Sequence, residues 1–281
     1  MNRRKYIYLA AIIPFFLLTL MYELIPVAMT VIRSFQVDTG VGLDNYAAVF
    51  AGQYYLKSIT NSLVISLGSS AVGIIIAFLG SYAAFSSPEK TRRLFSTVLN
   101  IAANFAGVPL AFSYIILFGS SGIMVALGSI FGIQWLADYN LYSSGGLSLI
   151  YIYFQIPVAT LVLMPAFESI KTEWLESAQL LKASKLRFWT SVGLPVIFPS
   201  IAGTFCFLFA NSMSAYATAY ALVGSNYSLL TVQIASMFTG DVFPKYGLGS
   251  ALSVIMIVLI SIAVYFNSKL ISGRGAGYEK A

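Results

Sequence analysis

Long apolar runs separated by short polar segments dominate this chain and determine its predicted architecture. Six runs are long enough to cross a bilayer, which takes roughly 20 apolar residues, and they lie at about 6–32, 59–85, 94–119, 147–167, 191–223 and 247–268. The fifth run exceeds one crossing, and Pro195, Pro199 and Gly203 lie in its first half, so we expect it to tilt or break there. The pattern predicts an all-α polytopic membrane protein with six transmembrane helices, forming a single domain over residues 1–281.

The segment 120–146, between the third and fourth runs, is too short and too rich in Gly and Ser for another full crossing. Trp135 and the neighbouring tyrosines are typical of the boundary between membrane and water. We therefore expect a partial helix here that lies at this interface.

The composition agrees with a membrane protein and excludes several kinds of chemistry. Hydrophobic residues make up 58% of the chain and charged residues 9%, whereas a soluble domain carries about a quarter charged residues. The sequence has no histidine and one cysteine, Cys206, which excludes histidine acid–base chemistry, histidine metal sites and an internal disulfide. The net charge of +6 comes from basic residues at the ends of apolar runs, so it indicates membrane topology rather than nucleic-acid binding.

The distribution of lysine and arginine predicts the orientation of the chain. Most basic residues fall on one side of the predicted spans: Arg3, Arg4, Lys5, Lys90, Arg92, Arg93, Lys171, Lys182, Lys185, Arg187, Lys269, Arg274 and Lys280. The other side holds Arg33, Lys57 and Lys245. By the positive-inside rule, both termini and the loop 168–190 are cytoplasmic. The outward loops are then 33–58, 120–146 and 224–246.

A mixed-charge stretch interrupts the apolar pattern in the predicted cytoplasmic loop. Thr172 can cap a helix whose first turns hold Glu173 and Glu176, where the helix dipole favours negative charge. The apolar positions repeat at helical spacing and form one stripe: Trp174, Leu175, Ala178 and Leu181. The pattern predicts a short amphipathic helix. Three roles fit it: a plain connector between two spans, a helix on the lipid surface, or a helix seated in a groove of another protein.

Within this stretch, Glu176-Ser177-Ala178 is followed by Lys182 and Ala183-Ser184, and then by Leu194-Pro195 at the next span. The order resembles the EAA loop of binding-protein-dependent ABC importer permeases, in which an acidic residue precedes two small residues, a glycine and a Leu-Pro pair. Lys182 occupies the position of that glycine. We therefore expect the turn to be made differently here, or the helix to continue.

Further segments extend the resemblance over most of the chain. Gly42-Leu43-Asp44-Asn45-Tyr46 and Asn61-Ser62-Leu63 resemble motifs that open the outer segment and the second span in the same family. Residues 211–224 resemble the stretch that lines the pathway in its polyamine, iron and oxyanion branch. The chain is thus similar to type I ABC importer permeases, and the resemblance implies six spans with a cytoplasmic coupling helix.

The resemblance implies that the helix 172–184 is this coupling helix and seats in a cleft of a separate ATPase subunit. The implied contact residues are Glu173, Trp174, Glu176, Ser177, Ala178, Leu181, Lys182, Ala183 and Ser184. The chain has no GxxxxGK[ST] motif, so we expect a transport subunit that is not itself an enzyme and binds no cofactor. ATP and magnesium would bind the partner and drive alternation between inward-open and outward-open states.

The same resemblance implies a pathway for a small polar solute of the polyamine, iron, oxyanion or phosphonate type. Polar residues inside spans are costly and mark such pathways, and the candidates are Asn104, Asn211, Ser214, Tyr216 and Glu23. Asn211, Ser214 and Tyr216, which lie in the fifth run, are explained equally well as polar contacts between neighbouring helices. Glu23 fits either a cation contact or a position at the outer interface.

The implied partners include a second permease subunit, identical or homologous, an extracytoplasmic solute-binding protein docked on loops 33–58 and 224–246, and the lipid bilayer, but no nucleic acid. The implied location is the inner membrane of a bacterial cell, with several crossings. A secondary transporter driven by an ion gradient is the alternative. It would need buried acidic or histidine residues to bind the coupling ion, and Glu23 is the single candidate in the sequence.

Overall fold

The structure is a computed structural model that describes residues 12–37, 40–224, 227–239 and 244–278. The predicted basic residues Arg3, Arg4, Lys5 and Lys280 lie outside the described residues. Within the described part, the chain is helical apart from one short β-hairpin. The prediction of an all-α membrane protein is therefore confirmed.

Six helical segments of the described chain are long and apolar enough to cross a membrane, as the sequence predicts. They are Ile12–Ser34, Gln53–Phe85, Val108–Phe131, Ser144–Glu168, Lys185–Met213 and Tyr246–Lys269. The third differs from the predicted run 94–119, because that run falls on two helices, α5 (Glu89–Asn104) and α6 (Val108–Phe118). Gly107, with a φ of 73°, lies in the break between them, in a region of backbone space that glycine enters freely.

Three long helices pack together at the centre of the molecule: α4 (Gln53–Phe85), α9 (Ser144–Glu168) and α12 (Leu194–Met213). The face of α4 toward α9 is lined by small residues, which let the two backbones approach. A Cβ atom added at Gly73 would lie 3.3 Å from the Cβ of Gln155 on α9. The close approach therefore depends on glycine at this point.

The overlong fifth run breaks, as expected, but the break lies at its far end and not beside the prolines of its first half. The π-helix η2 (Trp189–Gly193) leads into α12, and α12 continues through Pro199 to Met213. Pro195 follows directly after η2 inside a continuous helical segment, and a proline there lacks the N–H that would bond to the preceding turn. The chain leaves the helix at Ser214 and Ala215 and then forms α13 (Tyr216–Val223).

A group of short elements, here called the clasp, lies at one end of the molecule. The first span ends in η1 (Leu20–Leu24) and α2 (Ile25–Ser34), followed by the hairpin of β1 (Gln36–Val37) and β2 (Gly40–Val41) and by α3 (Asp44–Ala51). The side-chain N–H of Asn45 donates to the carbonyls of Ser34 (3.1 Å) and Gln36 (2.8 Å), and the hydroxyls of Tyr46 and Ser34 lie 2.7 Å apart. The segment that begins at Gly42 thus fastens the start of α3 to the end of α2.

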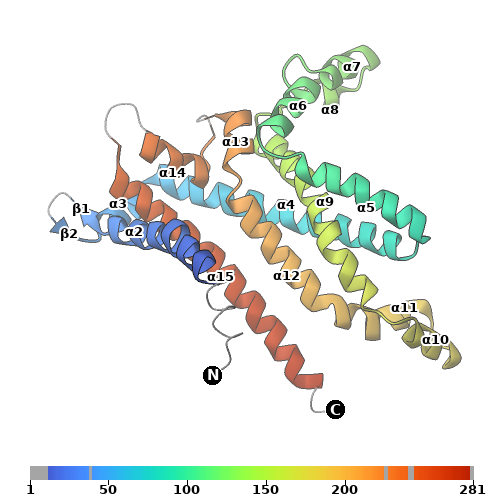
Figure 1. Ribbon diagram of the computed structural model, residues 1–281. Helices are drawn as coiled ribbons and strands as arrows, with labels where there is room; N and C mark the ends of the chain where they lie inside the picture. Colours follow the sequence, from blue (N-terminus) through green and yellow to red (C-terminus); the bar gives the residue numbers. More distant parts are fainter. Residues whose placement is uncertain (1–11, 38–39, 225–226, 240–243, 279–281) are drawn as a thin grey trace, which may run out of the picture.

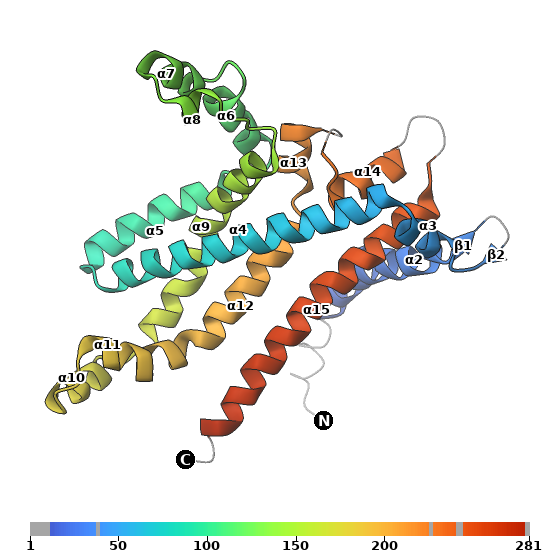
Figure 2. The ribbon, with the colours of Figure 1, turned by 180° about the vertical axis from the view of Figure 1, so that it is seen from behind.

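The chain ends with α14 (Leu230–Thr239) and α15 (Tyr246–Tyr278). Helix α15 lies beside α2 (Figure 1), and Figure 2 shows the same pair from behind. The C-terminal end of α15 and the hairpin of α10 (Thr172–Leu180) and α11 (Lys185–Phe188) project from the same end of the molecule in both views.

The predicted interfacial segment between α6 and α9 forms two short helices, α7 (Ile123–Phe131) and α8 (Gln134–Ala137). Together with α6 they project to one side of the bundle (Figures 1 and 2).

Candidate functional site

The predicted coupling helix is a helical hairpin rather than one helix over 172–184. Helix α10 begins at Thr172 and ends at Leu180, and Lys171 occupies its N-cap position. The prediction that Thr172 caps the helix was therefore wrong. A turn at Leu181 and Lys182 separates α10 from α11, which begins at Lys185.

The turn has the hydrogen bonds of a Schellman motif. The backbone N–H of Ala183 donates to the carbonyl of Ala178 and that of Lys182 donates to the carbonyl of Gln179, both at 2.9 Å. Lys182 has a φ of 55° and is the one non-glycine residue with positive φ among the described residues. In this motif the left-handed residue after the helix is usually glycine. Lys182 therefore makes the turn that the resemblance assigns to glycine, and the expectation of a different turn or a longer helix was wrong.

The second arm of the hairpin is capped by a side chain. The hydroxyl oxygen of Ser184 accepts the backbone N–H of Arg187 at 3.2 Å, as an N-cap serine does. Helix α11 then runs directly into η2 and α12. The Schellman turn and the cap together fix the angle at which α10 is presented.

The hairpin divides into an inner and an outer apolar surface. Leu175 and Ala178 pack against a buried cluster of Phe167, Ile170, Phe188 and Ile197, so Ala178 faces the molecule's own core and is not part of an outward docking surface. Leu180, Leu181 and Leu186 are 85%, 83% and 75% exposed. Of these, sequence reasoning identified Leu181 alone, because Leu180 falls on the polar side of the predicted helix.

The polar residues of α10 lie toward the solvent. Glu173, Glu176 and Ser177 are exposed, and the Ser177 hydroxyl donates to the carbonyl of Glu173 at 2.7 Å. Trp174 is partly exposed, and the ammonium of Lys171 lies 6.0 Å from the centroid of its ring. The outer face of the hairpin thus combines exposed carboxylates with exposed leucines.

An aromatic cluster anchors the base of the hairpin to the nearby ends of two spans. Trp189 meets the ring of Tyr82 edge-on at 5.1 Å between centroids, and it lies 5.9 Å from Phe167 and 6.5 Å from Phe85. These partners belong to α4 and α9. Trp189 therefore joins the base of the hairpin to both helices through close aromatic packing.

The first break in a span borders an open cleft of about 430 Å³. Its lining residues are Val98, Ile101, Ala102, Asn104, Phe105 and Tyr153. Asn104 is exposed at the end of α5, and its side-chain N–H donates to the carbonyl of Asn100 at 2.8 Å. The predicted pathway residue Asn104 thus lies beside unwound backbone, which occurs at membrane depth only inside protein or along a cavity.

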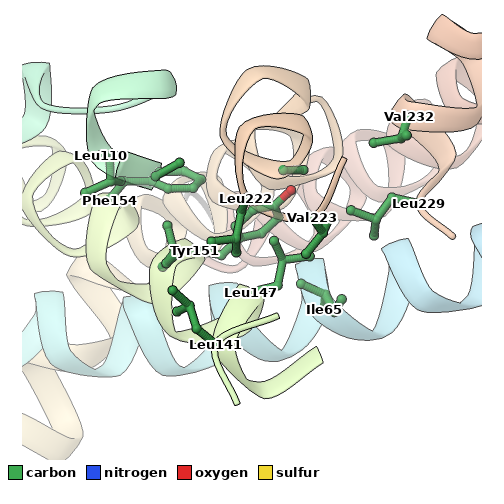
Figure 3. Close-up of a cluster of buried hydrophobic side chains, with 13 residues drawn as sticks. Ile65, Leu110, Leu141, Leu147, Tyr151, Phe154, Leu222, Val223, Leu229 and Val232 are labelled. Atoms are coloured by element: carbon green, nitrogen blue, oxygen red, sulfur yellow. The ribbon is translucent and has the colours of Figure 1, made fainter. Parts of the chain in front are cut away.

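The second break, between α12 and α13, is linked to the first by contacts with α6, which begins at the first break, and with α9. Helix α13 packs against α6, and the hydroxyl of Tyr151 on α9 donates to the carbonyl of Ala215 at 3.0 Å. Figure 3 shows Tyr151 among Leu222 and Val223 of α13. The two breaks therefore share one buried apolar core.

The predicted pathway residues separate into two groups. Tyr216 is exposed at the start of α13, with its ring stacked on Tyr220 at 5.3 Å, and Ser214 donates to the carbonyl of Ala210 at 2.8 Å. Asn211 is half-buried on α12. Glu23 is exposed in η1, on a span whose packing partner is α15, so the structure does not bring it together with the others.

Sequence reasoning missed a buried polar link between the three central helices. The side-chain N–H of Gln155 on α9 donates to the hydroxyl of Ser69 on α4 at 3.0 Å, and this hydroxyl lies 3.4 Å from that of Ser212 on α12. All three side chains are buried. Polar groups inside a span are costly, and Gln155 next to Pro157 was a signal, but nothing in the sequence pairs it with Ser69.

The chain is similar to known transport permeases. It is 27% identical over 243 residues to the multiple sugar-binding transport system permease protein MsmF of Streptococcus mutans serotype c, covering 82% of this chain and 80% of the relative. It is 24% identical over 242 residues to the thiamine transport system permease protein ThiP of Haemophilus influenzae. That match covers 84% of this chain and 44% of the longer relative.

The fold also matches a solved structure. A bacterial ABC transporter involved in the import of the acidic polysaccharide alginate superimposes with a TM-score of 0.74 at 19% identity, over 95% of this chain and 96% of the other. The family model of the binding-protein-dependent transport system inner membrane component matches residues 76–272, a region that contains α9, α12, the end of α4, both breaks and the hairpin. The chain therefore belongs to the family of binding-protein-dependent transport system inner membrane components, and it is the permease subunit of an ABC importer.

Proposed function

We propose that the hairpin of α10 and α11 couples this permease to ATP hydrolysis by a separate subunit. The observation that carries the proposal is the Schellman turn at Lys182, which presents exposed leucines and Glu176 on a hairpin fixed to two spans. An amphipathic helix of this kind fits a groove on a partner protein. The chain itself lacks a nucleotide-binding motif, so ATP and magnesium bind on the partner.

Movement of the partner would act on the spans through the aromatic cluster of Trp189. The cluster joins the hairpin to the inner ends of α4 and α9, and the buried link of Gln155 and Ser69 joins the same helices deeper in the bundle. We infer that α4 and α9 move together when the hairpin moves. Alternation between inward-open and outward-open states follows if the partner binds these states with different affinity.

The solute pathway we propose runs past the two broken helices. Asn104, Phe105 and Tyr153 line the cleft at the first break, and no charged residue lines it. A cavity with aromatic walls and a few polar groups suits a neutral polar molecule. This favours a sugar-like solute over the polyamine, iron, oxyanion or phosphonate type expected from the sequence, and MsmF among the relatives is named for sugars.

We further propose that the chain works as one of two permease subunits, identical or homologous, in the inner membrane of a bacterial cell. An extracytoplasmic solute-binding protein would deliver the solute at the outer end, and both termini would be cytoplasmic. The excess of basic residues on the side of the hairpin supports this orientation. Within loop 33–58, on which the binding protein is expected to dock, Tyr46 and Tyr54 form hydrogen bonds to Ser34 and Gln233.

Copurification tests the proposal. The chain is extracted from its host in mild detergent with an affinity tag, and the proteins that elute with it are identified by mass spectrometry. We expect an ATPase subunit with a GxxxxGK[ST] motif, together with ATP hydrolysis by the eluted complex. Consistent absence of such a subunit, under conditions in which the permease remains folded, would rule out the proposed coupling.

A further inference from the structure

A second pocket, of about 320 Å³ and here called the α8 pocket, lies between the turn that follows α6 and the segment that follows α8. Both views place α6, α7 and α8 at the end of the molecule opposite the α10–α11 hairpin (Figures 1 and 2). The volume is at the lower end of the roughly 300–1,000 Å³ that is typical of small-molecule pockets. Its polar lining residues are Ser120, Asp138, Tyr139, Asn140 and Tyr142.

Two polar side chains of the α8 pocket are free to bind a ligand. The carboxylate of Asp138 is exposed and makes no hydrogen bond or ion pair with another described residue. The side-chain oxygen of Asn140 accepts the backbone N–H of Tyr142 at 3.0 Å, which fixes the orientation of the amide group. The amide N–H groups of Asn140 have no acceptor among the described residues. One short segment therefore offers both an acceptor and donors.

A row of four aromatic rings, here called the aromatic row, connects the α8 pocket with the cleft at the first break. The ring of Tyr139 meets Phe118 edge-on at 5.6 Å between centroids, and Phe118 stacks on Tyr114 at 5.9 Å. Tyr114 meets Tyr153 edge-on at 5.7 Å, and Tyr153 lines the cleft together with Asn104. The first three rings pack on the buried apolar core that the two breaks share, but they are only partly buried.

The chemistry of these groups favours a neutral molecule with several hydroxyls. Each hydroxyl both donates and accepts, so neighbouring hydroxyls can pair with the carboxylate of Asp138 and with the amide of Asn140. The C–H face of a sugar ring is apolar and can pack on the aromatic row. An ammonium group only donates, so it would leave the N–H groups of Asn140 unpaired. An anion would be repelled by Asp138.

We propose that the α8 pocket is an entry site for a sugar ring and that the aromatic row leads the ring from there to the cleft beside Asn104. The entry site rests on the sugar-like solute proposed above and adds the place where this solute first binds the chain. The hydroxyls of Tyr114, Tyr139 and Tyr153 make no hydrogen bond to another described residue, so each can pair with a passing sugar hydroxyl. Successive centroids lie 5.6–5.9 Å apart, so the sugar keeps an aromatic partner at every step.

Saturation-transfer NMR tests the entry site, with D-glucose as the probe and the diamine putrescine as the comparison. The permease with its ATPase subunits is held in lipid nanodiscs free of sugar-based detergent, and the binding protein is left out because it would itself bind sugar. Saturating aromatic protons selects the protein, since the lipids have none, and transfer to the C–H protons of glucose is followed during a titration. Asp138→Ala is compared with Asp44→Ala, an exposed aspartate on α3. Tyr139→Leu is compared with Tyr265→Leu, an exposed tyrosine on α15.

We expect saturation transfer to glucose in the native complex. The apparent affinity should fall roughly tenfold or more in Asp138→Ala, because hydrogen bonds to charged groups are the stronger ones, and should stay unchanged in Asp44→Ala. Tyr139→Leu should reduce the transfer, whereas Tyr265→Leu should not. Asp138 is exposed, so its replacement leaves the fold intact and decides the test even if Tyr139→Leu does not assemble.

Three other results would each overturn the entry site. An unchanged affinity in Asp138→Ala would remove the α8 pocket from the pathway, and loss of transfer in Asn104→Ala would then place the sugar in the cleft alone, with the proposed solute class intact. Transfer to putrescine but not to glucose would overturn the sugar-like solute as well. Transfer to neither compound would show that the pocket binds no solute, without bearing on the coupling role of α10.

Discussion

The backbone N–H of Ala183 donates to the carbonyl of Ala178 across Lys182, and this 2.9 Å hydrogen bond closes helix α10. The bond exists only because Lys182 adopts a left-handed conformation. For residues other than glycine, this conformation costs roughly 1–2 kcal/mol. The end of α10 is therefore defined by one strained residue.

Replacing Lys182 tests this strain. In Lys182→Gly the relief of strain, roughly 1–2 kcal/mol, outweighs the greater freedom of the unfolded chain, worth roughly 0.5–1 kcal/mol, so we expect a stability equal to that of the native chain or up to about 1 kcal/mol higher. Lys182→Val should be clearly destabilising, because a β-branched residue tolerates positive φ poorly. Hydrogen–deuterium exchange at residues 182 and 183 measures the effect, and equal protection in both variants would contradict the assigned turn.

Reversing the charge of Glu176 tests the coupling role of α10. We expect Glu176→Lys to insert and fold normally, because Glu176 is exposed, and to lower ATP-dependent uptake in proteoliposomes on the order of tenfold, equivalent to about 1.4 kcal/mol. Glu89→Lys is the control, since Glu89 is an exposed acidic residue in the first turn of α5 and outside the hairpin. Uptake by Glu176→Lys equal to that of the control would remove Glu176 from the coupling surface.

The buried link between α9 and α4 predicts a measurable coupling energy. A double-mutant cycle with Gln155→Leu and Ser69→Ala should give about 0.6 kcal/mol, the mean for hydrogen bonds between membrane helices. Ser70→Ala is the control, because the Ser70 hydroxyl is buried without a hydrogen-bond partner in the described structure, and its loss should not reduce stability. Unfolding in detergent provides the free energies, and additive single effects would show that the contact contributes nothing.

The room around two glycines, Gly247 beside the clasp and Gly203 on α12, predicts opposite effects of replacing each by alanine. A Cβ at Gly247 would lie 2.7 Å from the side-chain nitrogen of Asn45 and 2.8 Å from the carbonyl oxygen of Gln36, so we expect Gly247→Ala to destabilise by about 1–3 kcal/mol. At Gly203 the nearest atom would be 3.9 Å away, and Gly203→Ala should be neutral or stabilising by up to roughly 1 kcal/mol. Melting temperatures of the two variants that shift together would refute the steric explanation.

The sequence predicts the spans well because a crossing needs only a long apolar run, which is a local property. It predicts the breaks less well, since Pro195 and Pro199 point to the first half of α12 whereas the chain leaves the helix at Ser214 and Ala215. That break is stabilised by Tyr151, which is 64 residues away in the sequence. Contacts of this range leave no periodic signal.

In the candidate site, too, the local element could be predicted from the sequence, but the contacts that shape it could not. Helical spacing predicted α10, but the apolar and polar pattern continues past Leu180, so only the resemblance pointed to a turn near Lys182. A lysine with positive φ has no signature in a one-dimensional pattern. The packing of Ala178 against the core likewise follows from the turn, because the turn fixes which face of α10 points inward.

The left-handed Lys182 has a consequence for how related chains are found. A motif search that demands glycine at this position would pass over the chain, although its backbone makes the hydrogen bonds of a Schellman motif. A search that compares backbone dihedral angles would still find the chain. The identifying mark of the loop is thus a shape that several residue types can adopt, each with a different stability.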